Sequence, residues 1–444
     1  KDAHGEPNAP DMANTDTQGN TVMFSAINRG EPVNFIKPKW AYTFSEDDLK
    51  YREHANSVGS HVDGGALVEF EEGSGRLPHF SNVDNGYWWI ELGGWKNDII
   101  FDGEDIRDEL LKVLYGVWDH IKNGGDHGAE NFDLEWVGIL PGMREGRRIL
   151  GDYILTENDI LENRRFADGV AYGGWAMDVH TAHGLYDFDK NPSFIRCFDG
   201  SYEIPYRCYY SRNVDNLMMA GKIISASKMG ISSARVIGTC AIGGQAVGTA
   251  AAMCIHKGTS PRGLLPYMAE LRRDLVRDDC YLPGFSERDS LLSDAAVTAS
   301  STKDGFSADA VIRGESRSIG NEENCWASNG IAEEGESLTL KLPETRTLQQ
   351  VRLTFDSNFH YPIKITLSNK RRAQQRIGVP PELVRDYRVR LWRDGQIVAE
   401  RAVTDNVQRL NVLNFGGIAA DTVECIFTAT NGCEDVRVFA VDGY

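Results

Sequence analysis

The stretch Asn216–Cys254 reads NLMMAGKIISASKMGISSARVIGTCAIGGQAVGTAAAMC and says more about the fold than any other part of the chain. A short apolar run, Leu217–Ala220, ends at Gly221, which predicts a buried strand whose backbone comes close to something bulky. Gly243 and Gly244 then open a predicted helix built almost entirely of small residues. The free N–H groups and positive dipole end of such a helix favour an electron-rich or anionic group. The alternative is a tightly packed helix–strand pair with no ligand.

This stretch resembles the closing flavin-contacting segment of the FAD-dependent oxidoreductase family. Five earlier stretches fit the same family pattern, in the same order along the chain. They are GYWWIELGG (Gly86–Gly94), IRDELLKVLYGVWDHIKN (Ile106–Asn123), GMREGRRILGDYILTENDI (Gly142–Ile160), VAYGGWAMDVH (Val170–His180) and YEIPYRCYYSRNVDNLMMAG (Tyr202–Gly221). The resemblance extends to about residue 260 and implies a flavoprotein with FAD as its cofactor. It also implies that FAD contacts Gly221, Arg235, Gly243, Gly244 and Gln245.

The usual pyrophosphate-binding motif of such flavoproteins is missing from the sequence. That motif is an N-terminal G-x-G-x-x-G turn, and it occurs nowhere among the 444 residues. The sequence also opens without Met, at KDAHGEPNAP. We therefore expect the C-terminal portion of a longer flavoenzyme that lacks its main dinucleotide-binding half. We expect no bound FAD in this chain alone.

Four residues depart from the family pattern. The family commonly has Arg and then Thr-His where this chain has Lys222 and Ser227-Lys228, and Ser where it has Gly146. If that His takes part in chemistry or flavin attachment, this protein has lost it. Lys228 keeps a positive charge near the flavin, but only a strongly lowered pKa would make it a base near neutral pH.

Composition excludes several classes of function. The chain is 41% hydrophobic and 25% charged, with a net charge of −18. This charge argues against nucleic acid and anionic membrane surfaces, because phosphate binding needs a concentrated positive surface. We read no apolar run near the roughly 20 residues of a membrane span, and no signal peptide is visible. These features predict a soluble acidic protein.

The cysteine pattern gives little sign of a metal site. None of the eight cysteines forms C-x-x-C, so zinc and iron–sulfur sites are not expected. Scattered cysteines of this kind are usually buried thiols. Cys425 and Cys433 lie close together in a β-rich region and could pair in an oxidising compartment.

We expect an α+β fold, part of a flavoprotein, followed by an all-β sandwich. Residues 1–20 form an irregular leader, 21–210 a substrate-side α+β domain, 211–284 the FAD-contacting segment with a connector helix, and 285–444 the sandwich. In the first part, the apolar stripe of residues 106–121 predicts a helix capped by Asp102. In the last, Asp394-Gly395 between alternating arms predicts a hairpin.

The last part of the chain resembles the discoidin-like (coagulation factor type C) β-sandwich. The resemblance lies in TASSTKDGFSADAVIRGE at Thr298–Glu315, CWAS at Cys325–Ser328 and the closing RVFAVDGY, while the stretch around Pro380–Leu383 departs from it. Domains of this type often bind sugars through loops at one end. The alternative is a packing or spacer domain.

His180 is the predicted catalytic base. A flavin dehydrogenase needs a group that takes a proton while hydride leaves carbon, and histidine titrates in the right range. Asp178, two positions earlier, shares a face with it if the stretch is extended. The alternative is a structural His. A metal site at His180 and His183 is weakly indicated, and we predict no metal.

The predicted substrate-binding residues are Arg144, Arg147, Tyr206 and Arg207. The arginines of REGRR, which include Arg148, could grip a substrate carboxylate or lie against the flavin. Ion pairs with nearby acids are the alternative for the arginines, and a core position is the alternative for Tyr206.

Three hypotheses about function follow. The first is an FAD-dependent oxidoreductase acting on a small polar substrate, possibly a sugar or polyol. The second is a non-catalytic carbohydrate-binding or surface protein on an oxidoreductase-derived scaffold, and the third is a fragment inactive alone. The discoidin-like part favours a bacterial protein of the periplasm or cell exterior, with the cytoplasm as the alternative. Neither the electron acceptor nor the oligomeric state follows from the sequence.

Overall fold

The computed structural model describes residues 4–9, 14–52, 54, 60–63, 66–69, 83, 86–95, 97–125, 127–144, 146–359, 361, 373 and 375–444. It divides the chain into two compact units, residues 1–266 with 364–374 and residues 267–363 with 375–444. The dividing point places helix α6, Met268–Arg277, with the second unit. The start of the sandwich domain at residue 285 stays a prediction.

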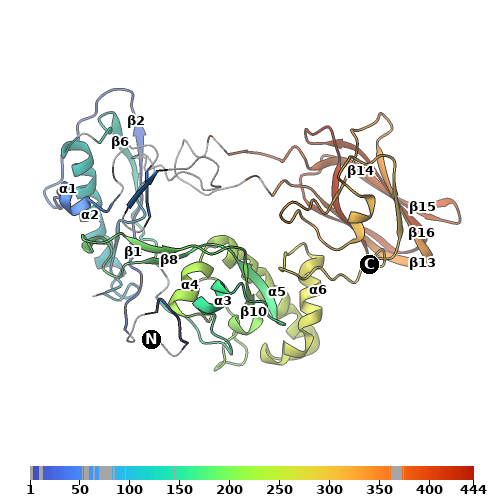
Figure 1. Ribbon diagram of the computed structural model, residues 1–444, viewed down its shortest axis with the longest axis horizontal. Helices are drawn as coiled ribbons and strands as arrows, with labels where there is room; N and C mark the ends of the chain where they lie inside the picture. Colours follow the sequence, from blue (N-terminus) through green and yellow to red (C-terminus); the bar gives the residue numbers. More distant parts are fainter. Residues whose placement is uncertain are drawn as a thin grey trace. The chain divides into compact units, whose positions relative to one another are not determined.

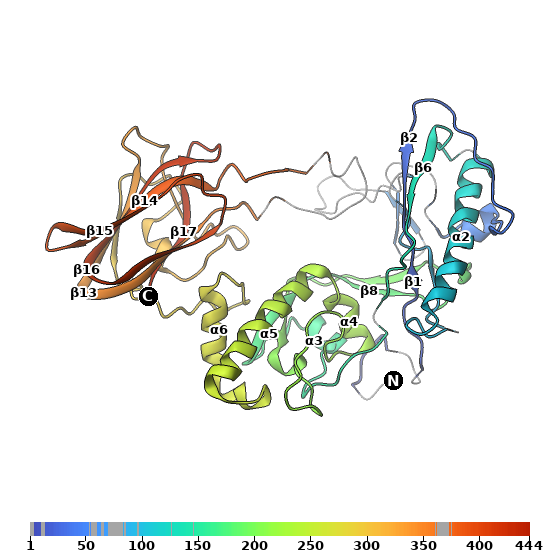
Figure 2. The same ribbon diagram turned by 180° about the vertical axis from the view of Figure 1, so that it is seen from behind.

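The N-terminal part of the first unit packs a long helix against short strands (Figures 1 and 2). Helix α2, Gly103–Asn123, presents its apolar stripe to the core, where its leucines and valines meet Phe24 and Ala26 of strand β2. Asp102 precedes the helix as expected, but its side chain accepts from the backbone of Asp98 rather than capping α2. The other elements are β1 (Asn20–Thr21), β2 (Phe24–Asn28), α1 (Glu46–Leu49), β3 (Ser60–Asp63), β4 (Ala66–Glu69), β5 (Glu91–Leu92) and β6 (Phe132–Val137). Antiparallel pairing joins β1 to β5, β2 to β6 and β3 to β4.

The rest of the first unit is built from short strands and three α-helices. Two antiparallel pairs, β7 with β10 and β8 with β9, lie among the helices. Thr156 and Asp159 form a capping box at the start of helix α3. The elements are α3 (Glu157–Leu161), β7 (Gly169–Gly173), β8 (Met177–His180), η1 (Gly184–Tyr186), β9 (Ser193–Arg196), β10 (Tyr202–Pro205), η2 (Tyr206–Cys208), α4 (Lys228–Ala234), α5 (Ile237–Lys257) and η3 (Arg262–Tyr267).

Two local expectations for the opening stretch are wrong. The run Leu217–Ala220 makes no strand; it has a single bridge, from Met218 to Tyr210, and Leu217 is 37% exposed. Gly243 and Gly244 do not open a helix, because α5 begins at Ile237 and places both glycines inside it. Their N–H groups therefore lie within the helix. Gly243 instead allows close packing, since a Cβ there would lie 2.6 Å from the ring of Tyr209.

Helix α5 is long and apolar enough, by length and composition, to cross a membrane, and among the described residues it alone passes that test. The core helices of soluble proteins pass it as well. In the first unit α5 turns Gly243, Ala246 and Ala250 inward and leaves Ile237 and Ile255 exposed. This finding differs from the expectation of no spanning segment. Alanine, isoleucine and glycine make up most of the helix, and its mean hydropathy is therefore high enough to pass the test.

The second unit contains an antiparallel β-sandwich, which confirms the predicted fold class. Strands β13 and β16 each bend and contribute to both layers. The first half of β13 pairs with β11, and its second half pairs with β17. Register shifts between Lys341 and Arg346 mark the bend. The strands are β11 (Ala296–Ala299), β12 (Trp326–Ala327), β13 (Glu336–Phe355), β14 (Val384–Arg393), β15 (Gln396–Val403), β16 (Leu410–Thr430) and β17 (Arg437–Gly443), with η4 at Ala308–Ile312.

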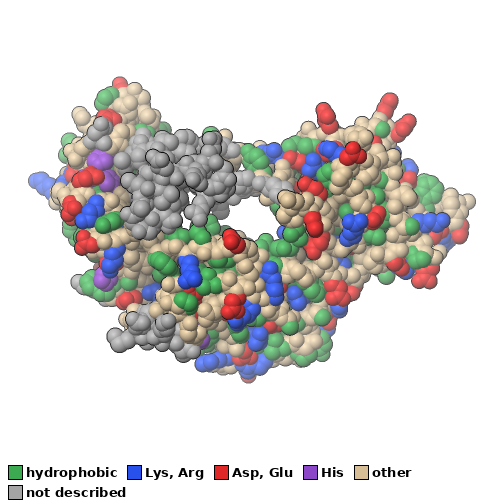
Figure 3. All heavy atoms as spheres, in the orientation of Figure 1, with side chains coloured by type: hydrophobic (Ala, Val, Ile, Leu, Met, Phe, Trp, Pro, Cys, Tyr) green, Lys and Arg blue, Asp and Glu red, His purple; other side chains and the backbone are tan. Residues whose placement is uncertain are grey.

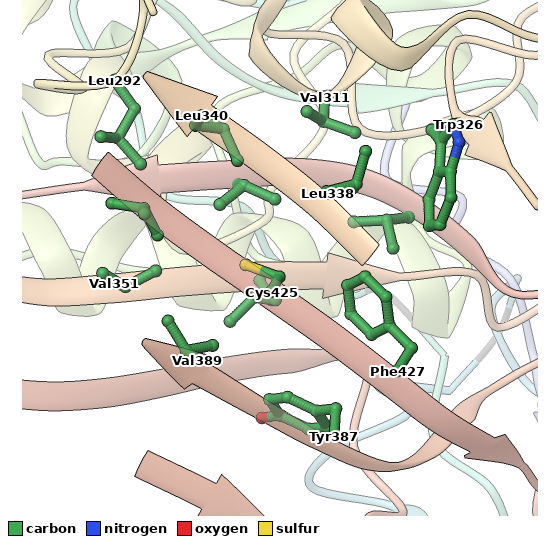
Figure 4. Close-up of a cluster of buried hydrophobic side chains, with 14 of the residues drawn as sticks. Leu292, Val311, Trp326, Leu338, Leu340, Val351, Tyr387, Val389, Cys425 and Phe427 are labelled. Atoms are coloured by element: carbon green, nitrogen blue, oxygen red, sulfur yellow. The ribbon is translucent and has the colours of Figure 1, made fainter. Parts of the chain in front are cut away.

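The space between the two layers is filled by apolar side chains (Figure 4). Leu340, Val351 and Phe427 are fully buried there, and Trp326 closes one end. The predicted hairpin is confirmed, with Asp394 and Gly395 joining β14 to β15 at positive φ values of 53° and 75°. On the face that Figure 3 shows, acidic and basic side chains of this unit are interspersed.

The suggested pairing of Cys425 with Cys433 is wrong, because both thiols are free in the structure. Cys425 points into the sandwich core from β16, where burial raises the pKa of its thiol. Cys433 follows the end of that strand, and its backbone N–H donates to Pro381. All eight cysteines are free.

Candidate active site around His180

Strand β8 carries the predicted catalytic pair. Its extended backbone places Asp178 and His180 on the same face, as expected from their spacing. Their side chains meet, with 3.3 Å between His180 Nε2 and Asp178 Oδ2. Pairing with β9 holds the strand in register, opposing His180 to Ser193. The local geometry of the pair therefore follows from the sequence.

A buried carboxylate lies on the other side of the imidazole. Glu91 Oε2 lies 2.7 Å from His180 Nδ1, and the Glu91 side chain is 2% exposed. The same carboxylate accepts from Arg144 at 3.3 Å and from the backbone of Gly19 at 2.8 Å. His180 is thus flanked by two carboxylates, one on each ring nitrogen.

Arg235 completes the cluster from the end of α4. Its Nη2 lies 3.2 Å from Asp178 Oδ2 and 3.2 Å from His180 Nε2, and its Nη1 donates to Gln18 at 2.8 Å. A guanidinium cannot accept a proton, so it faces the His180 lone pair only when the imidazole is neutral. The arginine predicted to contact FAD therefore contacts the predicted base.

The charges around His180 shift its titration. Burial lowers the pKa of the imidazole. The hydrogen bonds to Asp178 and Glu91 and the charges of these carboxylates together raise it by more than burial lowers it, so the pKa of His180 lies above its usual value. For Asp178, burial raises the pKa of the carboxyl, while His180 and Arg235 lower it, with a net decrease. The two carboxylates favour the imidazolium, whereas the Arg235 guanidinium at Nε2 favours the neutral ring.

His180 opens on a pocket of about 880 Å³ in the first unit. Three tryptophans line it, together with Arg144, Lys228 and Arg235; the tryptophans are Trp88, Trp89 and Trp175. Trp88 lies against the imidazole, with ring centroids 4.7 Å apart. A second hollow of about 300 Å³ shares Asp16, Val179 and Lys228 with this pocket. Apolar walls with a few polar groups are typical of small-molecule sites.

The arginines of REGRR separate into different places. Arg144 lines the pocket and donates to Thr21 and Glu91. Arg147 is exposed, pairs with Asp98 at 3.1 Å and covers the ring of Phe101. Arg148 lines the second hollow. The structure therefore brings Arg144, and not Arg147, to His180.

Tyr206 and Arg207 are held away from the residues that line the pocket. Tyr206 is fully buried, and its hydroxyl donates to the carbonyl of Pro261 at 2.9 Å. Arg207 forms two hydrogen bonds with Asp168, of 2.8 and 3.0 Å, and covers Tyr153. Both side chains therefore bind other protein groups. For Tyr206 this agrees with the alternative of a core position.

The remaining predicted FAD contacts lie on open surfaces or in packing. Gly221 has φ of +90°, and a Cβ there would meet nothing within 4 Å. Gly244 is equally open, and Gln245 is exposed on α5. Gly243 faces Tyr209 instead. The FAD-binding roles of these four residues stay predictions.

Sequence reasoning missed Glu91, Gln18 and the tryptophans of the pocket. Glu91 lies within the apolar run WWIEL, and a run of this kind indicates a buried segment that would bury the acid with it. A buried carboxylate needs a cation or hydrogen-bond donors, and this signal could have singled it out. Nothing in the sequence indicated that its partners would come from Gly19, Arg144 and His180.

Comparison with known proteins gives the family. A family model described as FAD dependent oxidoreductase matches residues 6–275, more than half of the chain. The chain belongs to the FAD-dependent oxidoreductase family. No curated protein matches it.

Among solved structures, the chain is similar to several small binding modules. A fucose-binding module of Streptococcus pneumoniae is 12% identical, covering 35% of this chain and 94% of that one, with a TM-score of 0.27. The lectin domain of lectinolysin complexed with Lewis B antigen is 17% identical, covering 35% and 96%, with a TM-score of 0.27. The family 32 carbohydrate-binding module of C. perfringens NanJ, in complex with galactose, is 16% identical, covering 34% and 95%, with a TM-score of 0.25.

Proposed function

We propose that this protein is an FAD-dependent oxidoreductase in which His180 is the base for a small polar substrate, a sugar or polyol. The observation that carries the proposal is the pairing of His180 with Glu91 at the wall of a pocket large enough for such a substrate. In the proposed reaction a hydroxyl carbon is oxidised to a carbonyl. His180 would take the hydroxyl proton, and FAD, when bound, would supply the acceptor for the hydride from the same carbon.

The groups around His180 hold its imidazole ring in one orientation, which suits a proton acceptor. In the neutral ring, Nδ1–H donates to Glu91, which leaves the lone pair on Nε2. Arg235 and Asp178 lie at that nitrogen and orient the ring. When Nε2 takes a proton, the two carboxylates stabilise the resulting imidazolium. Asp178 and Arg235 are accordingly positioning residues.

The residues at the pocket suit part of the cofactor. Arg235 and Lys228 line the pocket and supply positive charge there, which suits the electron-rich flavin ring. Burial lowers the pKa of Lys228, partly offset by the charge of Asp16. For the pyrophosphate, the sequence offers no G-x-G-x-x-G turn. We therefore assign only the contacts of the flavin ring to this chain.

The lining of the pocket supports a sugar or polyol as the substrate. Trp175 is 55% exposed and Trp88 is 36% exposed, so both indole rings are available to a ligand. The C–H faces of a sugar ring pack on indole rings, while its hydroxyls need hydrogen-bond partners. Asp178, Arg144 and Lys190 line the same pocket and supply such groups. We extend this proposal to a periplasmic or extracellular location, supported by the discoidin-like pattern in the last part of the sequence.

The test is anaerobic reduction of bound flavin by a panel of sugars and polyols, using the complete open reading frame loaded with FAD. His180→Ala should slow reduction by roughly 100- to 10,000-fold and leave the flavin content unchanged. His256→Ala, at an exposed position on α5, is the matched control and should reduce at the wild-type rate.

Unchanged flavin reduction in His180→Ala would remove this residue from the chemistry. Sugar binding in calorimetry, without flavin reduction by any member of the panel, would instead favour the non-catalytic carbohydrate-binding hypothesis.

A further inference from the structure

Three histidines and a glutamate meet in the first unit, away from His180. Glu46 begins α1, His54 follows that helix, His120 lies in the last turn of α2 and His127 follows α2. One ligand atom from each lies within 4.8 Å of all the others. The space-filling view shows histidine side chains, in purple, at the surface over the α1–α2 region (Figure 3). Two helix–loop segments far apart in sequence thus bring four metal-ligating groups together.

Backbone carbonyls orient two of the imidazoles. His54 Nδ1 lies 2.5 Å from the carbonyl of Arg52, and His120 Nδ1 lies 3.1 Å from that of Phe44. A carbonyl accepts only from N–H, so the proton is on Nδ1 in both neutral rings, and the Nε2 lone pairs face the Glu46 carboxylate. This arrangement, with one ring nitrogen held by a carbonyl, is the usual support of a metal-bound histidine.

Two ring nitrogens in the cluster are buried without a hydrogen bond. His54 and His127 are 6% and 7% exposed. Among the described residues, neither His54 Nε2 nor His127 Nδ1 has a hydrogen-bond partner. Leaving a buried polar atom unpaired is destabilising. His54 Nε2 faces Glu46 across 3.4 Å, and a cation that takes up its lone pair would give this atom the partner it lacks.

The spacing of the ligand atoms suits a small tetrahedral cation. Glu46 oxygens lie 3.4 Å from His54 Nε2, 3.0 Å from His120 Nε2 and 3.3 Å from His127 Nε2. Ligands at about 2.0–2.1 Å from zinc, at tetrahedral angles, lie roughly 3.3–3.4 Å from one another. Imidazole with carboxylate is a donor set that zinc accepts.

We propose that Glu46, His54, His120 and His127 bind a Zn²⁺ ion. The site was not expected from the sequence, which has no C-x-x-C and spreads these ligands over two separate segments. The Glu46 side chain is 70% exposed, so the ion reaches the site from solvent past this carboxylate. With four protein ligands the site is structural rather than catalytic.

The zinc site supports the wall of the His180 pocket. Arg52, two residues before His54, donates to the carbonyls of Gly184, Asp187 and Lys190. Asp187 and Lys190 line the pocket. Tyr87, next to the pocket residue Trp88, donates to the carbonyl of His54 at 3.2 Å. Zinc bound to His54 would therefore hold in place Arg52 and the His54 carbonyl, which make these contacts with the wall of the pocket.

The first experiment measures metal content. After expression in zinc-supplemented medium and dialysis against metal-free buffer, mass spectrometry of the wild-type chain should find one zinc per chain. His120→Ala and His127→Ala should each lower the retained zinc by at least about tenfold, within the range known for loss of zinc-site partners. His256→Ala, an exposed histidine outside the cluster, should retain it. Equal zinc in all four proteins would overturn the proposal.

A second measurement uses the wild type alone, so that it does not depend on the folding of the variants. Metal-free protein titrated with Co²⁺ should show the intense visible bands of a tetrahedral site, and Zn²⁺ should abolish them at one equivalent. Zn²⁺ should also raise the melting temperature, whereas the same concentration of Mg²⁺ should not. Absence of the bands together with no rise in melting temperature would contradict the site. Neither readout depends on flavin or turnover.

Discussion

The sandwich of the second unit buries apolar side chains between long strands, whereas the first unit surrounds its pocket with short strands joined by buried charges. Strands β13 and β16 run for 20 and 21 residues. By contrast, β5, which carries Glu91, has two residues, and β8, which carries His180, has four. The comparison shows that a core built from alternating apolar residues can be predicted from short stretches of sequence. A site made by charged residues far apart in sequence cannot.

The largest effect on stability is expected at Glu91. Glu91→Gln removes the charge that Arg144 and His180 both face. Breaking a buried ion pair from one side costs about 3–5 kcal/mol, so the free energy of unfolding of the first unit should fall by that amount. Urea denaturation followed by hydrogen exchange measures each unit separately. Glu104→Gln, at an exposed position in the first turn of α2, is the control and should cost less than about 1 kcal/mol.

If Glu91→Gln and Glu104→Gln unfold at the same urea concentration, buried charge does not hold the first unit together. The contrast between the units would then be lost.

In the second unit the corresponding change is Leu340→Ala. Leu340 is fully buried between the layers, and truncation of a core leucine costs about 2–5 kcal/mol. The loss should appear in the exchange rates of the second unit alone. Ile397→Ala, at a position on β15 that is 46% exposed, should cost far less. Similar losses for both would show that the sandwich core is not close-packed at Leu340.

Adjacent glycines of α5 give a smaller, matched pair. Gly243→Ala places a Cβ 2.6 Å from the Tyr209 ring and should cost about 1–3 kcal/mol by overpacking. Gly244→Ala meets nothing within 4 Å and should stabilise the helix by roughly 0.5–1 kcal/mol. Thermal unfolding measures both. Equal effects would show that Gly243 is not constrained by packing.

The smallest effect is the pH dependence of stability near neutrality. The folded pKa of His180 is raised above its unfolded value of about 6.5. Its contribution is therefore fully present below that value and is lost as the pH rises through the folded pKa. The first unit should therefore be less stable above this window than below it. Asp178→Asn should flatten the slope; an unchanged slope would place its origin elsewhere.

The outcome for particular residues shows what sequence can predict. The Asp394-Gly395 hairpin, the α2 stripe and the Asp178–His180 pair all rest on local spacing, and all three are confirmed. The run Leu217–Ala220 has the apolar pattern of a strand, yet within the described part of the chain it forms a single bridge, from Met218 to Tyr210. Glu91 and the His54 cluster depend on partners far away in the chain, which no local pattern encodes.

The central claim is that His180 is the base at a flavin site, and its most direct test is the pH dependence of flavin reduction. The measurement is the single-turnover rate of substrate-dependent reduction in the FAD-loaded protein, from acid to alkaline pH. A base works in its neutral form, so the rate should rise with pH through an apparent pKa above 6.5. In Asp178→Asn that apparent pKa should move to lower pH, because a hydrogen bond that raises it is weakened. A rate that falls with pH, or a profile identical in the two proteins, would contradict the account.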